Sequence, residues 1–262
     1  MAPAPPDTSG PVSAVMDSSP SGTHCPQAPG VVVALPGEAR SLARLRSLGD
    51  APLAGGGHVM LAGLGAQRAA AAAERLVARG ADGLVSWGTA AAIVPGMAPG
   101  DLVLARTVRS VDGQLFEVDA VWRQRMADVL VGRVVLADGL LTESHEMLVD
   151  VEAKQRVQRA TQASVCDMES AAIARVAARH GLPFLVVRAI VDDATMVLPP
   201  AARAAVSETG ALQPISLARS LMGRPASLHA QLRSLKHLGV AFRAARTSLG
   251  QAASALRQVS SV

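Results

Sequence analysis

The chain has 262 residues, half of them apolar and only 2% aromatic, and its formal net charge is +4. This length is enough for one domain with a full core plus appended segments. The uncharged apolar stretches fall well short of the roughly 20 residues that cross a membrane, so no spanning helix is expected. With no Tyr, two Trp and three Phe, stacking on single-stranded nucleic acid is disfavoured, and no nucleic-acid partner is expected.

The first 29 residues differ in composition from the rest of the chain. They are rich in Pro, Ser, Gly and Ala and lack a basic start followed by an apolar segment, which predicts a disordered leader over residues 1–29 rather than a signal peptide. The only cysteines are Cys25 and Cys166, and no group of residues has the spacing of metal ligands. A cytoplasmic protein with neither a structural disulfide nor a metal is therefore expected.

Residues 30–200 alternate between strand patterns and helix patterns. An Ala-rich helix from Gln67 to Arg79 ends at Gly80, and short apolar runs lie on both sides of it. The strands expected before residue 140 are Val31–Leu35, His58–Ala62, Leu84–Trp87, Gly100–Ala105 and Arg133–Ala137. This alternation predicts a single α/β domain with a mixed central sheet flanked by helices.

The segment 164–194 is the most informative part of this domain. A helix is expected to open at Asp167 as its N-cap and to stop at Gly181, which supplies a left-handed residue. The run 185–191 that follows is apolar except for one Arg, as in a strand that is covered on both faces.

Two acids stand at the ends of this helix and strand. Glu169 is expected in the first helical turn, and Asp192 comes where the strand ends. Ligands of α/β proteins bind at the carboxyl ends of strands and at neighbouring helix starts. Two carboxylates there indicate a site that recognises hydroxyls and handles protons.

Residues 201–262 form a basic extension of a different kind. From Arg203 onward there are eight Arg or Lys residues and one acid, Glu208. Apolar residues at alternating spacings of three and four predict one long amphipathic helix: Leu228, Leu232, Leu235, Leu238, Phe242, Ala245, Leu249, Ala252, Leu256 and Val259. Such a helix packs on its own domain or on a second subunit of a homo-oligomer, or it lies on an anionic membrane surface through residues 225–262.

The order MES…VRAIVDD within residues 168–193 resembles the M-E-[SA]-x-A…V-R-x-[IV]-[SV]-D pattern of the purine nucleoside phosphorylase and nucleosidase superfamily. This resemblance implies a nucleoside phosphorylase-like fold and cleavage of the N-glycosidic bond of a purine nucleoside-type substrate. It implies that Glu169 accepts hydrogen bonds from the ribose hydroxyls and that Met168 packs under the ribose. Asp192 would donate a proton to the departing purine, with Asp193 as the competitor for that role. No cofactor is implied, and inorganic phosphate is the one co-substrate left open.

The resemblance extends to VVVALPGEAR, residues 31–40. Nucleosidases of the superfamily carry a Glu in this loop that activates the attacking water, and Glu38 occupies that position. Phosphate-using relatives tend to place an Arg there, because a dianion needs cationic donors, so Glu38 favours hydrolysis over phosphorolysis. Thr89 takes the hydroxyl position of the family's G-[ST]-A-G-G strand end, where it would orient the water or phosphate. Ala91 and Ala92 replace the glycine pair and narrow the space around the nucleophile.

Residues 140–148, LLTESHEML, resemble the loop that holds the base in nucleosidases. The alignment puts Met147 in the place of the aromatic residue that stacks on the purine, a change that a polarizable thioether tolerates. Leu148 would offer backbone groups to the purine edge. His145 matches no catalytic position and is expected to be an ordinary loop residue.

The basic extension resembles most closely that of the hopanoid-associated phosphorylase subgroup. The resemblance implies release of adenine from adenosylhopane, a lipid-linked nucleoside, by an enzyme at the inner membrane. Two alternatives stay open. One is a soluble nucleosidase of methylthioadenosine or adenosylhomocysteine whose tail makes oligomer contacts, and the other is a phosphorylase-fold protein that binds a nucleoside without turnover.

Overall fold

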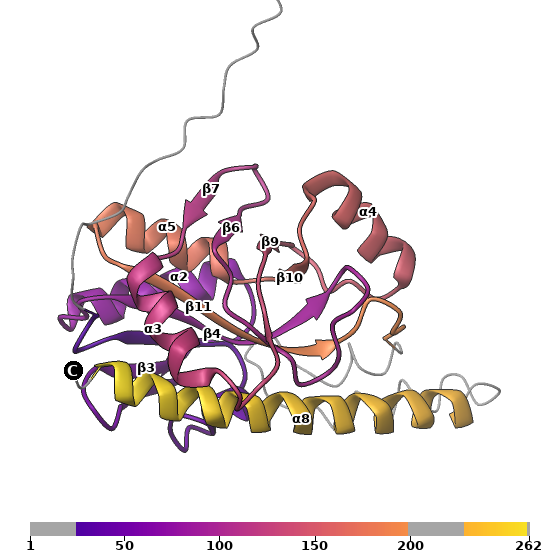
Figure 1. Cartoon of the computed structure of the whole chain (residues 1–262), viewed down its shortest axis with the longest axis horizontal. Coiled ribbons are helices and arrows are strands. Elements are labelled where there is room, and N and C mark those ends of the chain that lie inside the picture. Colours follow the sequence, from indigo (N-terminus) through magenta and orange to yellow (C-terminus); the bar gives the residue numbers. More distant parts are fainter. Residues whose placement is uncertain (1–24, 199–227, 261–262) are drawn as a thin grey trace, which may run out of the picture.

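The computed structural model describes residues 25–198 and 228–260 (Figure 1). Residues 1–24 of the expected leader lie outside this part, as do residues 199–227, with which the expected extension begins. Residues 25–29 pack on the domain: Cys25 is buried, and the backbone N–H groups of Gln27 and Ala28 donate to the Asp82 carboxylate at 2.8 and 2.9 Å.

Parallel strands form the centre of the sheet. β1 (Gly30–Val33) lies between β3 (His58–Leu61) and β4 (Leu84–Ala92), and β4 also pairs in parallel with β11 (Phe184–Asp192). Nearly all side chains of β1, β4 and β11 are buried, as expected of parallel strands that helices cover on both faces. The carboxyl ends of these strands meet at one edge of the sheet, where α/β proteins place their sites.

Shorter strands make the sheet mixed. β2 (Gly49–Pro52) pairs antiparallel with β3, and β10 (Val165–Asp167) pairs antiparallel with the end of β4. The remaining strands are β5 (Leu102–Val103), β6 (Thr107–Arg109), β7 (Leu115–Glu117), β8 (Leu136–Ala137) and β9 (Leu140–Glu143). In the described ranges all eleven strands belong to one sheet, which confirms the predicted mixed α/β architecture.

Helices cover the sheet in two pairs (Figure 1). α2 (Ala66–Ala78) packs with α5 (Ser170–His180), and α3 (Ala120–Leu130) packs with α8 (Leu228–Ser260). The one-turn helix α1 (Pro36–Ala39) directly follows β1. α4 (Val151–Thr161) lies between β9 and β10 in the chain and projects beyond the sheet. Helices α3 and α4 were not predicted, although Trp122, Met126 and Leu130 recur every four residues on the buried face of α3.

Strand β4 continues to Ala92, beyond its expected end at Trp87. Its last two residues change partners, because Ala91 and Ala92 pair antiparallel with Cys166 and Val165 of β10. Thr89 is therefore a mid-strand residue, and the expectation that it closes a strand is wrong. The reason is pairing across the sheet, which the local sequence does not reveal: β11 pairs with β4 as far as Ala91, and β10 pairs with Ala91 and Ala92.

The start of α5 differs from the prediction by two residues. Asp167 ends β10, and the helix begins at Ser170 with Glu169 at the N-cap. Asp167 still caps the helix through its side chain, since its Oδ1 accepts from the backbone N–H of Ser170 at 3.1 Å and of Glu169 at 3.3 Å. The predicted stop is confirmed: Gly181 has φ 62° and β11 follows.

α8 confirms the predicted long helix, and its apolar stripe divides into two parts. Toward the C-terminus, Ala245, Leu249, Ala252 and Leu256 are buried in the same core as the central strands. Toward the N-terminus, the side chain of Leu232 is 49% exposed. The packing on its own domain therefore accounts for the second half of the stripe only. No helix in the described part of the chain has the length and hydropathy to cross a membrane.

We expect Leu249→Ala to lower the free energy of unfolding by about 2–5 kcal/mol, because it removes a fully buried side chain from between α8 and the sheet. The matched control is Leu232→Ala on the same helix, for which a change within about 0.5 kcal/mol is expected at an exposed position. Urea unfolding of both variants measures the difference. Equal losses would contradict this division of α8.

Candidate active site

The candidate site lies where the central parallel strands end. Glu38 is on α1, directly after β1, while Thr89 and Arg188 come from the paired strands β4 and β11. Glu169 begins α5, and Asp192 is the last residue of β11, in register with Ala91 of β4. Five residues from well-separated parts of the sequence thus share one edge of the sheet.

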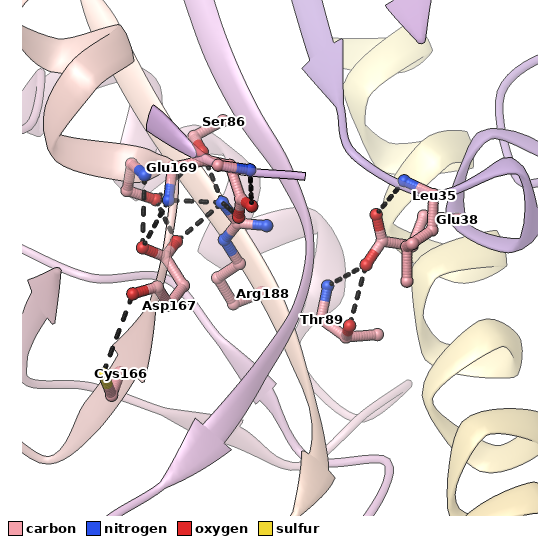
Figure 2. Close-up of polar contacts among 10 residues, drawn as sticks. Leu35, Glu38, Ser86, Thr89, Cys166, Asp167, Glu169 and Arg188 are labelled. Atoms are coloured by element: carbon pink, nitrogen blue, oxygen red, sulfur yellow. Dashed lines mark hydrogen bonds and ion pairs between the residues drawn. The ribbon is translucent and has the colours of Figure 1, made fainter. Parts of the chain in front are cut away.

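Glu38 is held by three hydrogen bonds (Figure 2). Its Oε1 accepts from the Thr89 backbone N–H at 2.8 Å and from the Thr89 hydroxyl at 2.7 Å, and its Oε2 accepts from the Leu35 N–H at 3.0 Å. The side chain is 2% exposed, and burial raises the pKa of its carboxyl against the opposing influence of Arg188 and these donors. Thr89 thus orients the carboxylate of Glu38, a role that differs from the predicted contact with the nucleophile.

Arg188 is the charged centre of a second group of side chains (Figure 2). It is 1% exposed, and its Nη2 lies 2.6 Å from Asp167 Oδ2 and 3.9 Å from Glu169 Oε2. The same nitrogen donates to the hydroxyls of Ser86 at 2.7 Å and Ser170 at 3.1 Å. In the sequence, Arg188 stands out only as an interruption of an apolar strand. A lone charge in a buried strand must be paired, and that rule could have identified it.

Glu169 joins this group from the N-cap of α5. Its Oε1 accepts from the Gly65 backbone N–H at 2.9 Å, in the loop before α2. Burial raises the pKa of Glu169 to about 7, with Arg188 acting in the opposite direction and Asp167 and Glu38 adding to the rise. Glu169 is therefore a buried acceptor that is close to its titration point near neutral pH.

Gly88 allows the Glu38 and Arg188 groups to approach each other. A Cβ at this position would lie 2.6 Å from Arg188 Nη1 and 2.8 Å from Glu38 Oε1, closer than real Cβ contacts allow. Any side chain here would therefore displace the guanidinium or the carboxylate. The close approach makes Glu38, Arg188 and Glu169 one electrostatic unit: Arg188 lowers the pKa of both carboxyls, and Glu38 raises that of Glu169.

Asp192 is buried and paired, whereas Asp193 is not. Asp192 is 3% exposed, and its Oδ1 accepts from Lys154 Nζ at 2.7 Å. Burial raises the pKa of Asp192 to about 6, and Lys154 opposes this rise. Asp193 is half-buried and accepts from the backbone N–H and the hydroxyl of Thr195, as a turn-forming Asp does. Lys154 was not among the predicted site residues, because nothing in the local sequence marks a helical Lys as buried.

The predicted base and ribose contacts are less enclosed. Met168 stands between Asp167 and Glu169 in the sequence, and its side chain is half-buried. Leu148 is half-buried and packs on a small apolar cluster of Ile93, Ala163 and Cys166. Met147 is 36% exposed, at the surface of the loop after β9. His145 is exposed, as expected of a loop residue.

The fold and the site together define an α/β protein that carries buried carboxylates at the ends of its parallel strands. Neutral donors hold one of them, Glu38, and an ammonium holds another, Asp192. Residues 30–212 match the family model of the phosphorylase superfamily. The chain belongs to this superfamily, as the motifs in residues 31–40 and 168–193 indicate.

Relatives of known description are similar over part of the chain. A 5′-methylthioadenosine/S-adenosylhomocysteine nucleosidase of Shewanella sp. (strain MR-7) is 27% identical over 156 residues, which cover 52% of this chain and 66% of that relative. A second one, of Shewanella oneidensis, is 28% identical over the same extent. The chain thus spans just under two thirds of the length of these relatives.

Solved structures share the fold. A putative methylthioadenosine nucleosidase from Weissella paramesenteroides is 25% identical, with a TM-score of 0.55 over 64% of this chain and 85% of that chain. A 5′-methylthioadenosine/S-adenosylhomocysteine nucleosidase from Neisseria meningitidis, in complex with methylthio-immucillin-A, has a TM-score of 0.64 and 17% identity, covering 88% of this chain and 98% of that chain.

The raised carboxyl pKa values predict that the protein loses stability as pH rises through the neutral range. A group that binds its proton more tightly when folded contributes stability below its unfolded pKa, and this contribution is lost as pH rises through its folded pKa. For Glu169 the window runs from the ordinary 4.5 to about 7. We expect the free energy of unfolding to fall between about pH 5 and pH 7.5, and Glu169→Gln to reduce that fall by roughly 1–3 kcal/mol.

Urea unfolding at the two pH values measures this effect. Glu152→Gln is the matched control, because the Glu152 side chain is 87% exposed on α4. A pH dependence in Glu169→Gln identical to that of the parent protein would show that Glu169 does not titrate in this window.

Proposed function

We propose that this protein is an enzyme that hydrolyses the N-glycosidic bond of a purine nucleoside. The observation that carries the proposal is the buried Glu38 carboxylate, fixed by Thr89 and Leu35 beside Arg188 and Glu169. Its two oxygens accept three hydrogen bonds in total, and a carboxylate has about four acceptor positions. One acceptor position therefore stays available for a water molecule. As this water attacks the anomeric carbon, Glu38 takes a proton from it.

The other site residues divide the remaining tasks. Glu169 accepts hydrogen bonds from the ribose hydroxyls and so fixes the sugar while the glycosidic bond stretches, with Met168 packed against the ribose. Asp192 protonates the departing purine, which Met147 and Leu148 contact. A pKa of about 6 keeps a useful fraction of Asp192 protonated near neutral pH, which a general acid requires.

The charge balance of the site favours water over phosphate as the nucleophile. Arg188 is the cation closest to Glu38, and it is already paired with Asp167 and close to Glu169. A phosphate dianion would face the carboxylates of Glu38 and Glu169, while Arg188 is already engaged with acids, whereas water needs only an acceptor. Inorganic phosphate is therefore not a co-substrate in this proposal, and the reaction needs no cofactor.

The relatives' names and the C-terminal helix point to different substrates. The Shewanella relatives are described as acting on 5′-methylthioadenosine and S-adenosylhomocysteine, which would suit a soluble nucleosidase. We favour a lipid-linked adenine nucleoside, adenosylhopane, because α8 contacts α1 directly and its Phe242 ring abuts Gly37, the residue before Glu38. An apolar group attached to the ribose would therefore leave the site beside an amphipathic helix.

The alternative of a nucleoside-binding protein without turnover is less well supported. It rested on Ala91 and Ala92, whose side chains disfavour the positive φ that glycines allow. Gln162 is the only non-glycine residue of the described ranges with a positive φ, so both alanines adopt ordinary strand conformations. The substitution of the glycine pair thus imposes no backbone strain on the site.

We expect purine release to proceed without phosphate, to yield the free sugar and to fall by about 10²–10⁴ in Glu38→Gln, the range that general base catalysis supplies. The assay follows adenine release from 5′-methylthioadenosine and from a lipid-linked adenine nucleoside, with and without phosphate. Glu152→Gln should match the parent protein. Strict phosphate dependence with a sugar 1-phosphate product would contradict hydrolysis.

We place the protein in the cytoplasm, at the inner face of the membrane, through the N-terminal half of α8. This half presents the exposed apolar side chains Leu232 and Val240 together with exposed Arg233 and Lys236, and the whole helix contains no acid. Basic residues beside an apolar strip are suited to anionic lipid headgroups. A second copy of the chain, in a homo-oligomer, is the other occupant that this strip could bind.

We expect the protein to sediment with anionic vesicles and the double change Arg233→Glu with Lys236→Glu to weaken that binding by at least about tenfold. The matched control is Arg156→Glu with Arg159→Glu, which alters the net charge equally on exposed positions of α4. Deletion of residues 225–262 would be uninformative, because it removes Leu249 and its neighbours from the core. Equal binding by both double variants, or a change in oligomeric state alone, would contradict the membrane contact.

A further inference from the structure

Lys154 is a buried lysine that the proposed reaction leaves without a role. Only two of the chain's 25 basic residues are lysines, Lys154 and Lys236, and Lys154 is 0% exposed. Its Nζ donates to three oxygens: Asp192 Oδ1 at 2.7 Å, the Asp193 carbonyl at 2.5 Å and the Met196 carbonyl at 2.8 Å. An ammonium has three N–H donors, so this cage uses all of them.

The type of residue and its place on the helix both indicate a specific role. Lys154 is the fourth residue of α4, close to the helix end at which the macrodipole favours acids over cations. Burial of an ammonium is also costly unless it is paired. A chain that otherwise uses arginine has a lysine here because a compact ammonium can serve three converging oxygens, whereas a planar guanidinium cannot.

We propose that Lys154 is a positioning residue that fixes the carboxyl of Asp192 for proton transfer to the leaving purine. The inference rests on the proposed function and deepens it. Because Oδ1 of Asp192 faces the ammonium, the transferable proton is carried by Oδ2. The two carbonyl contacts hold the chain after β11 in place, so that the acid cannot turn away from the substrate.

The same contacts join the acid to the loop that carries the base contacts. α4 begins after this loop, with the Asp150 side chain accepting from the Ala153 N–H at 2.7 Å as its cap. The Leu198 N–H donates to the Val149 carbonyl at 2.8 Å, a second link between the two segments. Lys154 therefore ties the segment with Met147 and Leu148 to the segment with Asp192, and the acid and the base contacts move as one unit.

Two measurements test this proposal. The first uses lysine labelled with ¹⁵N at Nζ, which gives only two side-chain signals in this chain, and Lys236→Met assigns them. The Lys154 signal should shift as pH passes through about 6, where Asp192 titrates, and this shift should vanish in Asp192→Asn. The charged groups that face Asp192 are Lys154 and Asp193, so Asp193→Asn is measured as well and should leave a titration of the Lys154 signal. A Lys154 signal with no shift near pH 6, or with the same shift in Asp192→Asn as in the parent protein, would overturn the proposal.

The second measurement is the pH profile of turnover in Lys154→Met, with Arg156→Met, at an exposed position of the same helix, as the matched control. Removal of the cation should move the alkaline limb of kcat/KM to higher pH by about one unit or more, because an adjacent positive charge lowers a carboxyl pKa. It should also lower kcat by roughly tenfold or more while KM changes little, since the ribose contacts stay intact. Lys154→Arg retains the charge without the compact ammonium, so its limb should move less than that of Lys154→Met while kcat still falls.

If folded Lys154→Met has its alkaline limb of kcat/KM at the same pH as the parent protein, the proposal is overturned. If Lys154→Met does not fold, the NMR titration of the parent protein and of Asp192→Asn decides it, since neither needs that variant. Failure of the proposed function is distinguishable from failure of this inference: it appears as absence of purine release by the parent protein, which does not affect the titration of the Lys154 signal.

Discussion

The pairing of Arg188 with buried acids is the interaction on which the site depends. Glu38, Asp167 and Glu169 are each at most 6% exposed, and burial alone favours the neutral form of Glu38 and Glu169. Arg188, at 1% exposure, opposes that tendency for Glu38 and Glu169 and forms a 2.6 Å ion pair with Asp167. Arg188 on β11 thus offsets the burial of acids from three other segments: α1, β10 and the start of α5.

The position of the central strand pair explains why this arrangement is sterically feasible. Gly88 of β4 stands in register with Arg188 of β11, and the missing side chain leaves the space in which the guanidinium and the Glu38 carboxylate lie. The hydroxyls of Ser86 and Ser170 accept hydrogen bonds from Nη2 of the guanidinium. Small residues at one level of the sheet therefore permit a concentration of charge that a core of larger side chains would exclude.

The two acids with assigned proton roles have different surroundings, and this difference suits different tasks. Glu38 is held by neutral donors from Thr89 and Leu35, which leaves its charge available to a water molecule. Asp192 is held by an ammonium and lies at the end of β11, where α4 and the chain after the strand meet. A base and an acid can thus operate in one buried site because each has a separate set of partners.

The sequence alone determined the class of fold, the helix stop at Gly181, the long C-terminal helix and the identity of Glu38, Glu169 and Asp192 as candidates, because these follow from periodicity, turn chemistry and local motifs. Only the tertiary structure decided which side chains partner them. Arg188 is far in sequence from Glu38, and Lys154 is far from Asp192. The residues next to Arg188 and Lys154 in the sequence do not indicate these contacts. The same reason applies to Thr89, which lies in mid-strand because β11 and then β10 pair with the end of β4. It also applies to α8, whose apolar stripe is buried by the domain toward its C-terminus while Leu232 stays exposed. Local patterns fix elements and residue types, whereas partners across a sheet depend on how the whole chain packs.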